Sequence, residues 1–306
     1  MAEAISNHRN NRDNIRLRRL ALLNYKKENI NRHNIKIAET KNELEQAFSL
    51  IYQEYLKLGY IRETQPSKLH VSLYNILPET SVFVLKSSPT VISTLTQIYD
   101  NEYFGLPMDA IYQEELNALR DKGRKLVEVS ALVVSRESRW CNHFMYLLRV
   151  TLGYAISNNV DDICIMVNPK HVKFYKTILL FEELGREKYY PEVGASAVAL
   201  RLNLDDIEDR MKDRYCSQDC DNNLHSFFYR PAGRAPGNDE SSLKKKGTMD
   251  IDAVRYFFIE KTDMLKKMSS DKKDCIDSIY PELKKGKSLS TDFSIAIPLS
   301  EEPPPF

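Results

Sequence analysis

The chain has 306 residues, with 44 Lys and Arg against 43 Asp and Glu and a formal net charge of +1 at pH 7. This balance disfavours a nucleic-acid-binding protein, which typically carries a strongly basic domain. No apolar run approaches the ~18 residues needed to cross a bilayer, and five cysteines, an odd number, favour a reducing cytoplasm over a disulfide framework.

Residues 1–36 are predicted to form a basic N-terminal arm. They carry nine basic side chains and three acidic ones, so the neutral total conceals an excess of positive charge at the start of the chain. The arm lacks the apolar core of a signal peptide, which favours a solvated segment over a targeting sequence.

Residues 37–205 are predicted to form one mixed α/β domain, because helix and strand patterns alternate along them. Thr40 and Glu43 form a capping box before apolar residues at helical spacing, and Gly59 ends this helix. The elements expected after it are the hairpin strands Ser81–Lys86 and Val91–Ile98, a helix capped by Asp109 that ends near Gly123, the strand Leu126–Val134, a helix over 142–157, the strand Ile163–Val167, a helix opened by Asn168 and Pro169, and a closing strand Ala197–Leu204.

Residues 206–306 are predicted to be a linker and a helical extension. The segment Pro231–Thr248 is rich in Gly, Pro, Ser and Lys, which is typical of a linker. Helix patterns resume at Ile251 and at Cys275.

A metal centre is not expected. Cys216, Cys220 and His225 resemble half of a zinc site, but no second cysteine pair follows them in the sequence.

The sequence contains one acidic residue, Glu128, within the apolar run 126–134, whereas the GxSxG, Walker, GxGxxG and HExxH signatures are absent. Strand alternation places Glu128 with Ser130 and Leu132 on one face. Apolar surroundings raise the pKa of a carboxyl group and suit it to general acid or base catalysis. The alternative interpretation is a glutamate that faces solvent on a half-exposed strand.

A second feature is the passage from a strand into a helix at Asn168, with Tyr175 seven residues further on. By its pattern alone, Tyr175 is more typical of a core aromatic whose hydroxyl finds a hydrogen-bond partner.

Together, the order of the elements, the acidic residue on the central strand and the spacing of Asn168 and Tyr175 resemble the GNAT acyltransferase superfamily. The chain is more closely similar to the N-acyl amino acid synthases of the FeeM type, which are relatives of the acyl-homoserine-lactone (autoinducer) synthases. The resemblance runs from about residue 50 to residue 205. Its most specific pieces are residues 105–109, 123–132 and 168–175.

The resemblance implies a GNAT-like fold, with a mixed, mostly antiparallel sheet and helices on its faces. Its central parallel strands, here 126–134 and 163–167, splay apart to hold a pantetheine arm. Backbone groups of Leu132, Val133 and Val134 would bind that arm and polarise the thioester carbonyl. Glu128 would act as the base beside the acceptor amine, and Tyr175 would protonate the departing thiolate.

The segment 136–142 departs from the coenzyme A-binding members of the superfamily. It has no glycine where they hold the pyrophosphate on a glycine-rich loop. This favours the acyl-phosphopantetheine of an acyl carrier protein as donor over acyl-CoA, with no permanently bound cofactor. Carrier proteins are acidic, so Arg136, Arg139 and Arg149 are candidates for docking the carrier, and Asn168 is a candidate for binding the donor.

The acceptor is expected to be a free amino acid rather than S-adenosylmethionine. Ala131 stands where the homoserine-lactone synthases carry the arginine of a Glu-x-x-Arg pair, and residues 67–75 lack their acidic residues. Tyr60, Arg62 and Ser130 are predicted to line the acceptor site, with Arg62 pairing with the carboxylate of the amino acid.

The sequence therefore predicts an N-acyltransferase that joins a long-chain fatty acyl group from acyl carrier protein to the α-amine of an amino acid. Two alternatives stay open: an acetyl- or acyl-CoA-dependent GNAT N-acetyltransferase acting on a small amine, and a non-catalytic module that binds acyl groups or the carrier. The helices over 250–280 either pack on the core or cover the acyl tunnel. The arm 1–36 would steer the acidic carrier or contact an anionic membrane peripherally.

Overall fold

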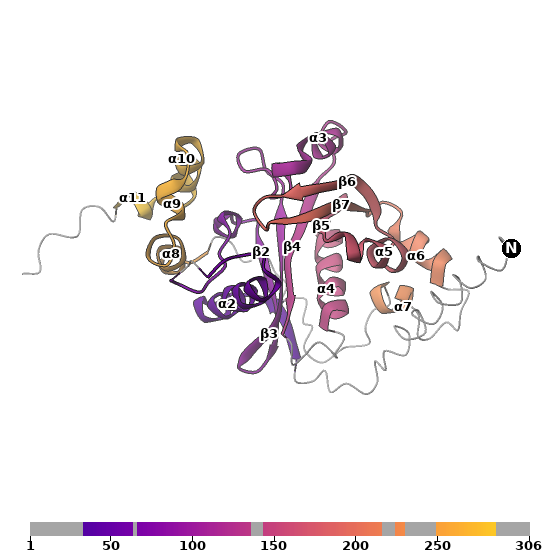
Figure 1. Cartoon of the computed structure of the whole chain (residues 1–306), viewed down its shortest axis with the longest axis horizontal. Helices are drawn as coiled ribbons and strands as arrows, with labels where there is room; N and C mark the ends of the chain where they lie inside the picture. Colours follow the sequence, from indigo (N-terminus) through magenta and orange to yellow (C-terminus); the bar gives the residue numbers. More distant parts are fainter. Residues whose placement is uncertain (1–32, 64–65, 136–142, 216–223, 230–248, 286–306) are drawn as a thin grey trace, which may run out of the picture.

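A seven-stranded sheet separates two layers of helices in the computed structural model (Figure 1), which describes residues 33–63, 66–135, 143–215, 224–229 and 249–285. The strand order is β1-β2-β3-β4-β5-β7-β6. β4 and β5 run parallel, and the other neighbouring pairs are antiparallel. The strands are β1 (His33–Ile37), β2 (Ser81–Ser87), β3 (Thr90–Tyr99), β4 (Leu126–Val134), β5 (Asp162–Val167), β6 (Glu182–Tyr190) and β7 (Ala195–Asn203). This arrangement confirms the predicted mixed, mostly antiparallel fold class.

The two faces of the sheet carry different helices (Figure 1). One face is covered by α2 (Lys41–Leu58) and by the C-terminal elements beyond it, which are α8 (Ile251–Arg255), the π-helical turn Tyr256–Glu260, α9 (Met264–Lys267), α10 (Ser270–Ile279) and α11 (Glu282–Lys285). The opposite face is covered by α4 (His143–Ser157), α5 (Pro169–Ile178), α6 (Ile207–Tyr215) and α7 (Leu224–Tyr229). α3 (Asp109–Arg120) packs against β6, and a 3₁₀ turn spans Leu73–Ile76.

The predicted caps of two helices are confirmed. Thr40 Oγ1 accepts a hydrogen bond from the Glu43 N–H, the Glu43 carboxylate accepts one from the Thr40 N–H, and Gly59 ends α2 with a φ of 75°. Asn168 accepts a hydrogen bond from the Lys170 N–H at the start of α5, with Pro169 in its first turn. These local signals are readable because each satisfies a backbone group that the end of a helix leaves without a partner.

Two sequence-based boundaries and one missing strand differ from the structure. β1 crosses the predicted end of the basic arm, because Ile35 and Ile37 are buried and pair the chain with β2. The strand β6 was not predicted, since its polar sequence reflects an edge position with much of its surface exposed to solvent. Asp109 is the first residue of α3 rather than its cap, and its carboxylate accepts a hydrogen bond from Leu106 instead.

A β-bulge in β4 corrects the predicted facing of Leu132. The register against β3 shifts between Thr94 and Thr96, and Ala131 adopts a φ of 50°. Two residues then oppose one, which reverses the alternation beyond the bulge. Leu132 therefore packs with Val127 and Val129 against α4 and not on the face of Glu128.

The central parallel strands splay apart, as the resemblance implied. β4 and β5 are paired from Leu126–Asp162 to Glu128–Cys164. Beyond that point β4 continues its pairing with β3, whereas β5 continues with β7 as far as Val167. The backbone edges that face each other after Glu128 and Cys164 are thus available to a ligand.

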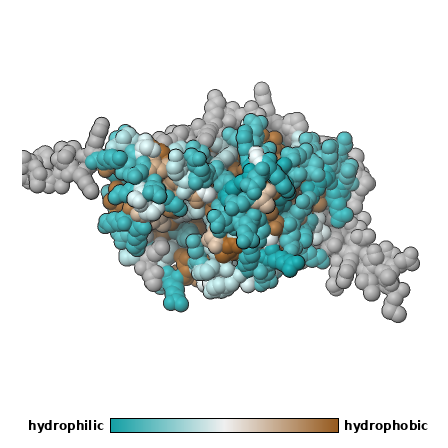
Figure 2. Space-filling model, turned by 90° about the horizontal axis from the view of Figure 1, so that it is seen from above, coloured by the Kyte–Doolittle hydropathy of each residue, from teal (hydrophilic) through white to brown (hydrophobic). Residues whose placement is uncertain are grey.

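The C-terminal helices pack on the core on the α2 side. Phe257 meets Phe48 of α2 edge to face with ring centroids 5.1 Å apart, and Val254 and Phe258 are fully buried in the same cluster. Of the alternatives for the segment 250–280, packing on the core is therefore the observed one. The surface seen from the α3 end is mostly hydrophilic with small hydrophobic patches (Figure 2), and the described helices include none that is long and apolar enough to cross a membrane.

Candidate functional site

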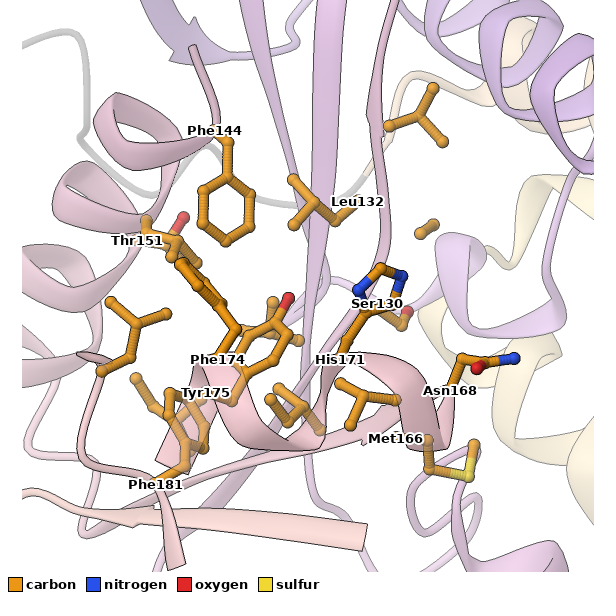
Figure 3. Close-up of a pocket in the computed structure, with 18 of the residues that line it drawn as sticks. Ser130, Leu132, Phe144, Thr151, Met166, Asn168, His171, Phe174, Tyr175 and Phe181 are labelled. Carbon is orange, nitrogen blue, oxygen red and sulfur yellow. The ribbon is translucent and has the colours of Figure 1, made fainter. Parts of the chain in front are cut away.

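Two cavities meet where β4 and β5 separate. The larger has a volume of about 490 Å³ and is bounded by β4, β5, α4 and α5 (Figure 3), and the smaller has about 240 Å³ and lies on the side of α2 and the β6–β7 turn. Both are lined by Ser130 and Ala131 of β4 and by Val167 and Asn168 at the end of β5. The splay thus joins two compartments of different character.

The larger cavity is mostly apolar. Phe144, Leu148 and Leu152 of α4 line one side, and Phe174 and Phe181 line another. Met211 of α6 and Phe228 of α7 also line it, so the first part of the extension 206–306 borders the cavity. Apolar walls of this kind hold a ligand through hydrophobic contact along its length.

Glu128 lines the smaller cavity and is 1% exposed. Its Oε2 accepts a hydrogen bond of 2.8 Å from the backbone N–H of Met108. Burial raises the pKa of Glu128 to about 8, against the effect of this hydrogen bond, and the negative charges of Asp109 and Glu192 add to the rise. A buried carboxyl group that titrates near neutrality can accept or donate a proton in a reaction.

Tyr175 reaches the larger cavity from α5, and its hydroxyl points into the cavity toward β4 (Figure 3). Its ring makes edge-to-face contacts with Phe144, Phe174 and Phe181. Burial raises the pKa of Tyr175 to about 12, so its hydroxyl is protonated at neutral pH and is available as a proton donor.

The other residues singled out by the sequence fall into four groups. Leu132, Val133 and Val134 line the larger cavity, whereas Tyr60, Ser130 and Asn168 line both. Arg62 is exposed and is not part of the wall of either cavity. Arg136, Arg139, Cys216 and Cys220 lie outside the described residues.

The sequence analysis missed several polar residues of the smaller cavity, among them His70, Tyr190 and Glu192. His70 lies against the Tyr55 ring with centroids 4.8 Å apart, and burial lowers its pKa. Tyr190 donates a hydrogen bond of 2.5 Å to Glu192. No local pattern marks these residues, because the unpredicted strand β6 and the loop after α2 bring them to the site.

Comparison with known proteins identifies a family that matches this chain. The family model described as N-acyl amino acid synthase FeeM matches residues 46–203, just over half of the chain. The solved structure of FeeM, an N-acyl amino acid synthase from uncultured soil microbes, is 29% identical, and the match covers 58% of this chain and 93% of that one with a TM-score of 0.53. No curated protein sequence matches the chain.

More distant solved structures are also similar. BjaI, a CoA-dependent acyl-homoserine lactone synthase, is 15% identical, with 60% of this chain and 89% of that chain covered and a TM-score of 0.46. An N-acetyltransferase from Staphylococcus aureus Mu50 is 16% identical, with 56% and 97% covered and a TM-score of 0.39. The family model matches more than half of the chain, and the matched part contains the splayed strands β4 and β5. The chain therefore belongs to the FeeM family of N-acyl amino acid synthases and is an N-acyltransferase with a GNAT-like fold.

Proposed function

We propose that the protein transfers a long-chain fatty acyl group from an acyl carrier protein thioester to the α-amine of an amino acid. The observation that carries the proposal is that a mostly apolar cavity meets a smaller cavity lined by the carboxyl groups of Glu128 and Glu192 at the splay of β4 and β5. The acyl chain would occupy the larger cavity and the amino acid the smaller one. The thioester would then lie at the junction, beside Ser130 and Ala131.

The bulge in β4 suits the binding of the pantetheine arm and thioester. A β-bulge leaves the extra residue outside the hydrogen-bonded ladder, and here the register shift lies at Ala131 and Leu132, next to the edge that β5 has left. The N–H groups in this stretch would bind the pantetheine amides and stabilise the oxyanion of the tetrahedral intermediate.

The reaction assigns one proton to each of two side chains. The amine nitrogen attacks the thioester carbonyl, Glu128 accepts the proton that the nitrogen loses, and the carbon–nitrogen bond forms. The intermediate then breaks its carbon–sulfur bond, and Tyr175 donates its proton to the leaving thiolate. A later proton exchange with water restores both side chains.

The carrier protein as donor is supported by the charge of α5. This helix contains no acidic residue, and it exposes Lys170, Lys173 and Lys176 next to the larger cavity, to whose wall it contributes His171 and Tyr175. An acidic carrier would be attracted to this surface while its prosthetic arm enters the cavity. Arg136, Arg139 and Arg149 stay predicted contacts of the same partner.

The test is a transfer assay that varies donor and acceptor separately. The protein is incubated with acyl carrier proteins loaded with short and long chains, with the matching acyl-CoA esters and with each of the common amino acids, and extracted products are identified by mass spectrometry. N-acyl amino acids formed from long-chain carrier thioesters are the expected result. Equal rates with acyl-CoA would contradict the donor, and acetylation of amines alone would favour the N-acetyltransferase alternative.

A further inference from the structure

We infer that Arg120 is a positioning residue for acyl transfer, because it holds the turn 105–109 in the conformation that aims the Met108 N–H at the Glu128 carboxyl group. The inference rests on the proposed role of Glu128 as the base. Arg120 lies at the end of α3 and touches neither cavity wall, so its effect would pass through the turn.

Arg120 forms ion pairs with two carboxylates, those of Asp109 and Asp100. Its Nη1 and Nη2 donate to the two carboxylate oxygens of Asp109 at 2.7 and 2.6 Å. Its Nε and Nη2 donate to the two oxygens of Asp100 at 2.7 and 2.8 Å. A planar guanidinium held in this way by two carboxylates is fixed in orientation as well as in place.

The Asp109 carboxylate closes the turn, and the backbone of Asp100 is hydrogen-bonded to β4. Asp109 Oδ2 also accepts a hydrogen bond of 2.7 Å from the Leu106 N–H, which closes the turn around Pro107 and Met108. The Asp100 N–H donates to the Leu126 carbonyl at the start of β4. Arg120 therefore ties the turn to the strand that carries Glu128.

The glycine at the start of the turn is required by this packing. Gly105 has a φ of 60°, and a Cβ atom there would lie 2.5 Å from Asp109 Oδ2. Such a contact would push the Asp109 carboxylate out of place, and positive φ disfavours a side chain in any case. Arg120, Asp109 and the turn 105–109 are called the clamp below, and a substitution of Gly105 is a second, independent way to disturb it.

The clamp settles which oxygen of Glu128 is free for chemistry. Oε2 is engaged by Met108, whereas Oε1 accepts no hydrogen bond from the part of the chain that the structure describes. Glu128 lines the smaller cavity, so Oε1 is the oxygen positioned for the acceptor amine or an intervening water. A rotation of the carboxyl group would lose this orientation, which a general base requires.

The pH dependence of transfer should report on the clamp, because losing the clamp would change the pKa of Glu128. Loss of the Met108 hydrogen bond removes an interaction that lowers the pKa of Glu128, and loss of Arg120 leaves the charge of Asp109 uncompensated, which raises that pKa. Glu192 also raises it. The other titratable groups that face Glu128 are uncharged at neutral pH because burial raises the pKa of the phenols and the thiol and lowers that of the imidazole; they are Tyr55, Tyr74, Tyr190, Cys164 and His70.

The experiment compares Arg120→Met, Arg120→Lys and Gly105→Ala in the carrier-dependent transfer assay, with kcat and KM measured across pH. For Arg120→Met we expect kcat at pH 7 to fall roughly tenfold with the donor KM unchanged. The rise of kcat with pH moves to higher pH in this variant and in Gly105→Ala, and Arg120→Lys recovers part of both effects.

Lys188→Met is the matched control. Lys188 donates to Glu115 and to the Ile111 carbonyl, so it also anchors α3, but through residues that follow the turn 105–109 and not through Asp109. This variant should lower Tm and leave the pH profile in place. The inference is overturned if Arg120→Met and Gly105→Ala lower Tm in the same way without moving the profile. Full activity of Glu128→Gln would overturn the proposed base itself, and the clamp with it.

Discussion

The backbone N–H of Met108 donates a hydrogen bond to Glu128 Oε2 across 2.8 Å, although 20 residues separate the two in sequence. One hydrogen bond from a helix start thus reaches a carboxyl group on the central strand and leaves its other oxygen for the smaller cavity. Because this hydrogen bond lowers the pKa of Glu128, its loss should be visible in the pH dependence of the reaction.

As the proposed base, Glu128 should set the pH dependence of transfer. Because a base must be deprotonated and burial raises the pKa of Glu128 to about 8, kcat/KM should increase with pH and reach half of its maximum at about pH 8. Glu128→Gln should lower kcat by about 10²–10⁴ and remove this rise. Steady-state kinetics across pH measure both effects.

Glu43→Gln is the control for that variant, since Glu43 is also buried but lies outside both cavities. It should keep the rise with pH. If kcat/KM of Glu128→Gln still increases with pH, a group other than Glu128 is responsible for the pH dependence.

Tyr175→Phe should slow the departure of the thiolate. The substitution removes only the hydroxyl that points into the cavity, so the ring contacts with Phe144 and Phe181 persist. We expect kcat to fall about 10–100-fold with little change in KM. An aryl thioester, whose thiolate needs no proton to leave, should be used by the variant and the parent at similar rates. An equal loss with both donors would assign Tyr175 a packing role instead.

The larger cavity should determine the length of the acyl chain. Leu148 of α4 lines it, so Leu148→Trp should shorten the preferred chain, with rates on long-chain carriers falling and rates on short-chain carriers preserved. Competition between carriers of different chain length, with products separated by mass, measures the change. Ile156→Trp on the same helix is exposed and should leave the preference unchanged. If Leu148→Trp keeps the chain-length preference of the parent, the acyl chain does not bind in the larger cavity.

Glu43 should stabilise the fold at neutral pH and not in acid. Despite burial, hydrogen bonds from Lys86 and from the backbone at Glu39, together with the charge of Lys36, lower the pKa of Glu43 to about 2. A lowered folded-state pKa gives stability that is present above about pH 4.5 and is lost as the pH falls toward 2. Glu43→Gln should therefore lower the free energy of unfolding by about 2 kcal/mol at pH 7 and by progressively less below pH 4.

Denaturant melts of Glu43→Gln at several pH values check this expectation. Glu63→Gln, at an exposed position, is the comparison and should differ little from the parent at any pH. A cost of Glu43→Gln that stays constant with pH would show that packing, and not charge, is responsible.

Local signals in the sequence predicted most elements because each depends on a few neighbouring residues. The capping box at Thr40 and Glu43, the start of α5 at Asn168 and the strand Leu126–Val134 all appear as predicted. β6 escaped prediction because its identity as a strand comes from pairing with β7 rather than from alternation of its own side chains. Leu132 was placed on the wrong face because a bulge changes alternation without any signal in the sequence.

The sequence by itself determined the strand that carries Glu128, the helix that carries Tyr175 and the family to which both belong. Only the tertiary structure decided that Met108 is hydrogen-bonded to Glu128, that Arg120 pairs with Asp109, and that Arg62 is outside both cavity walls. The physical reason is the separation in sequence of the residues that interact. Helix caps and strand patterns satisfy backbone groups within a few residues. The burial that raises the pKa of Glu128 comes from elements far apart in the sequence, since α2, β3, β5, β6 and β7 all line the cavity beside it.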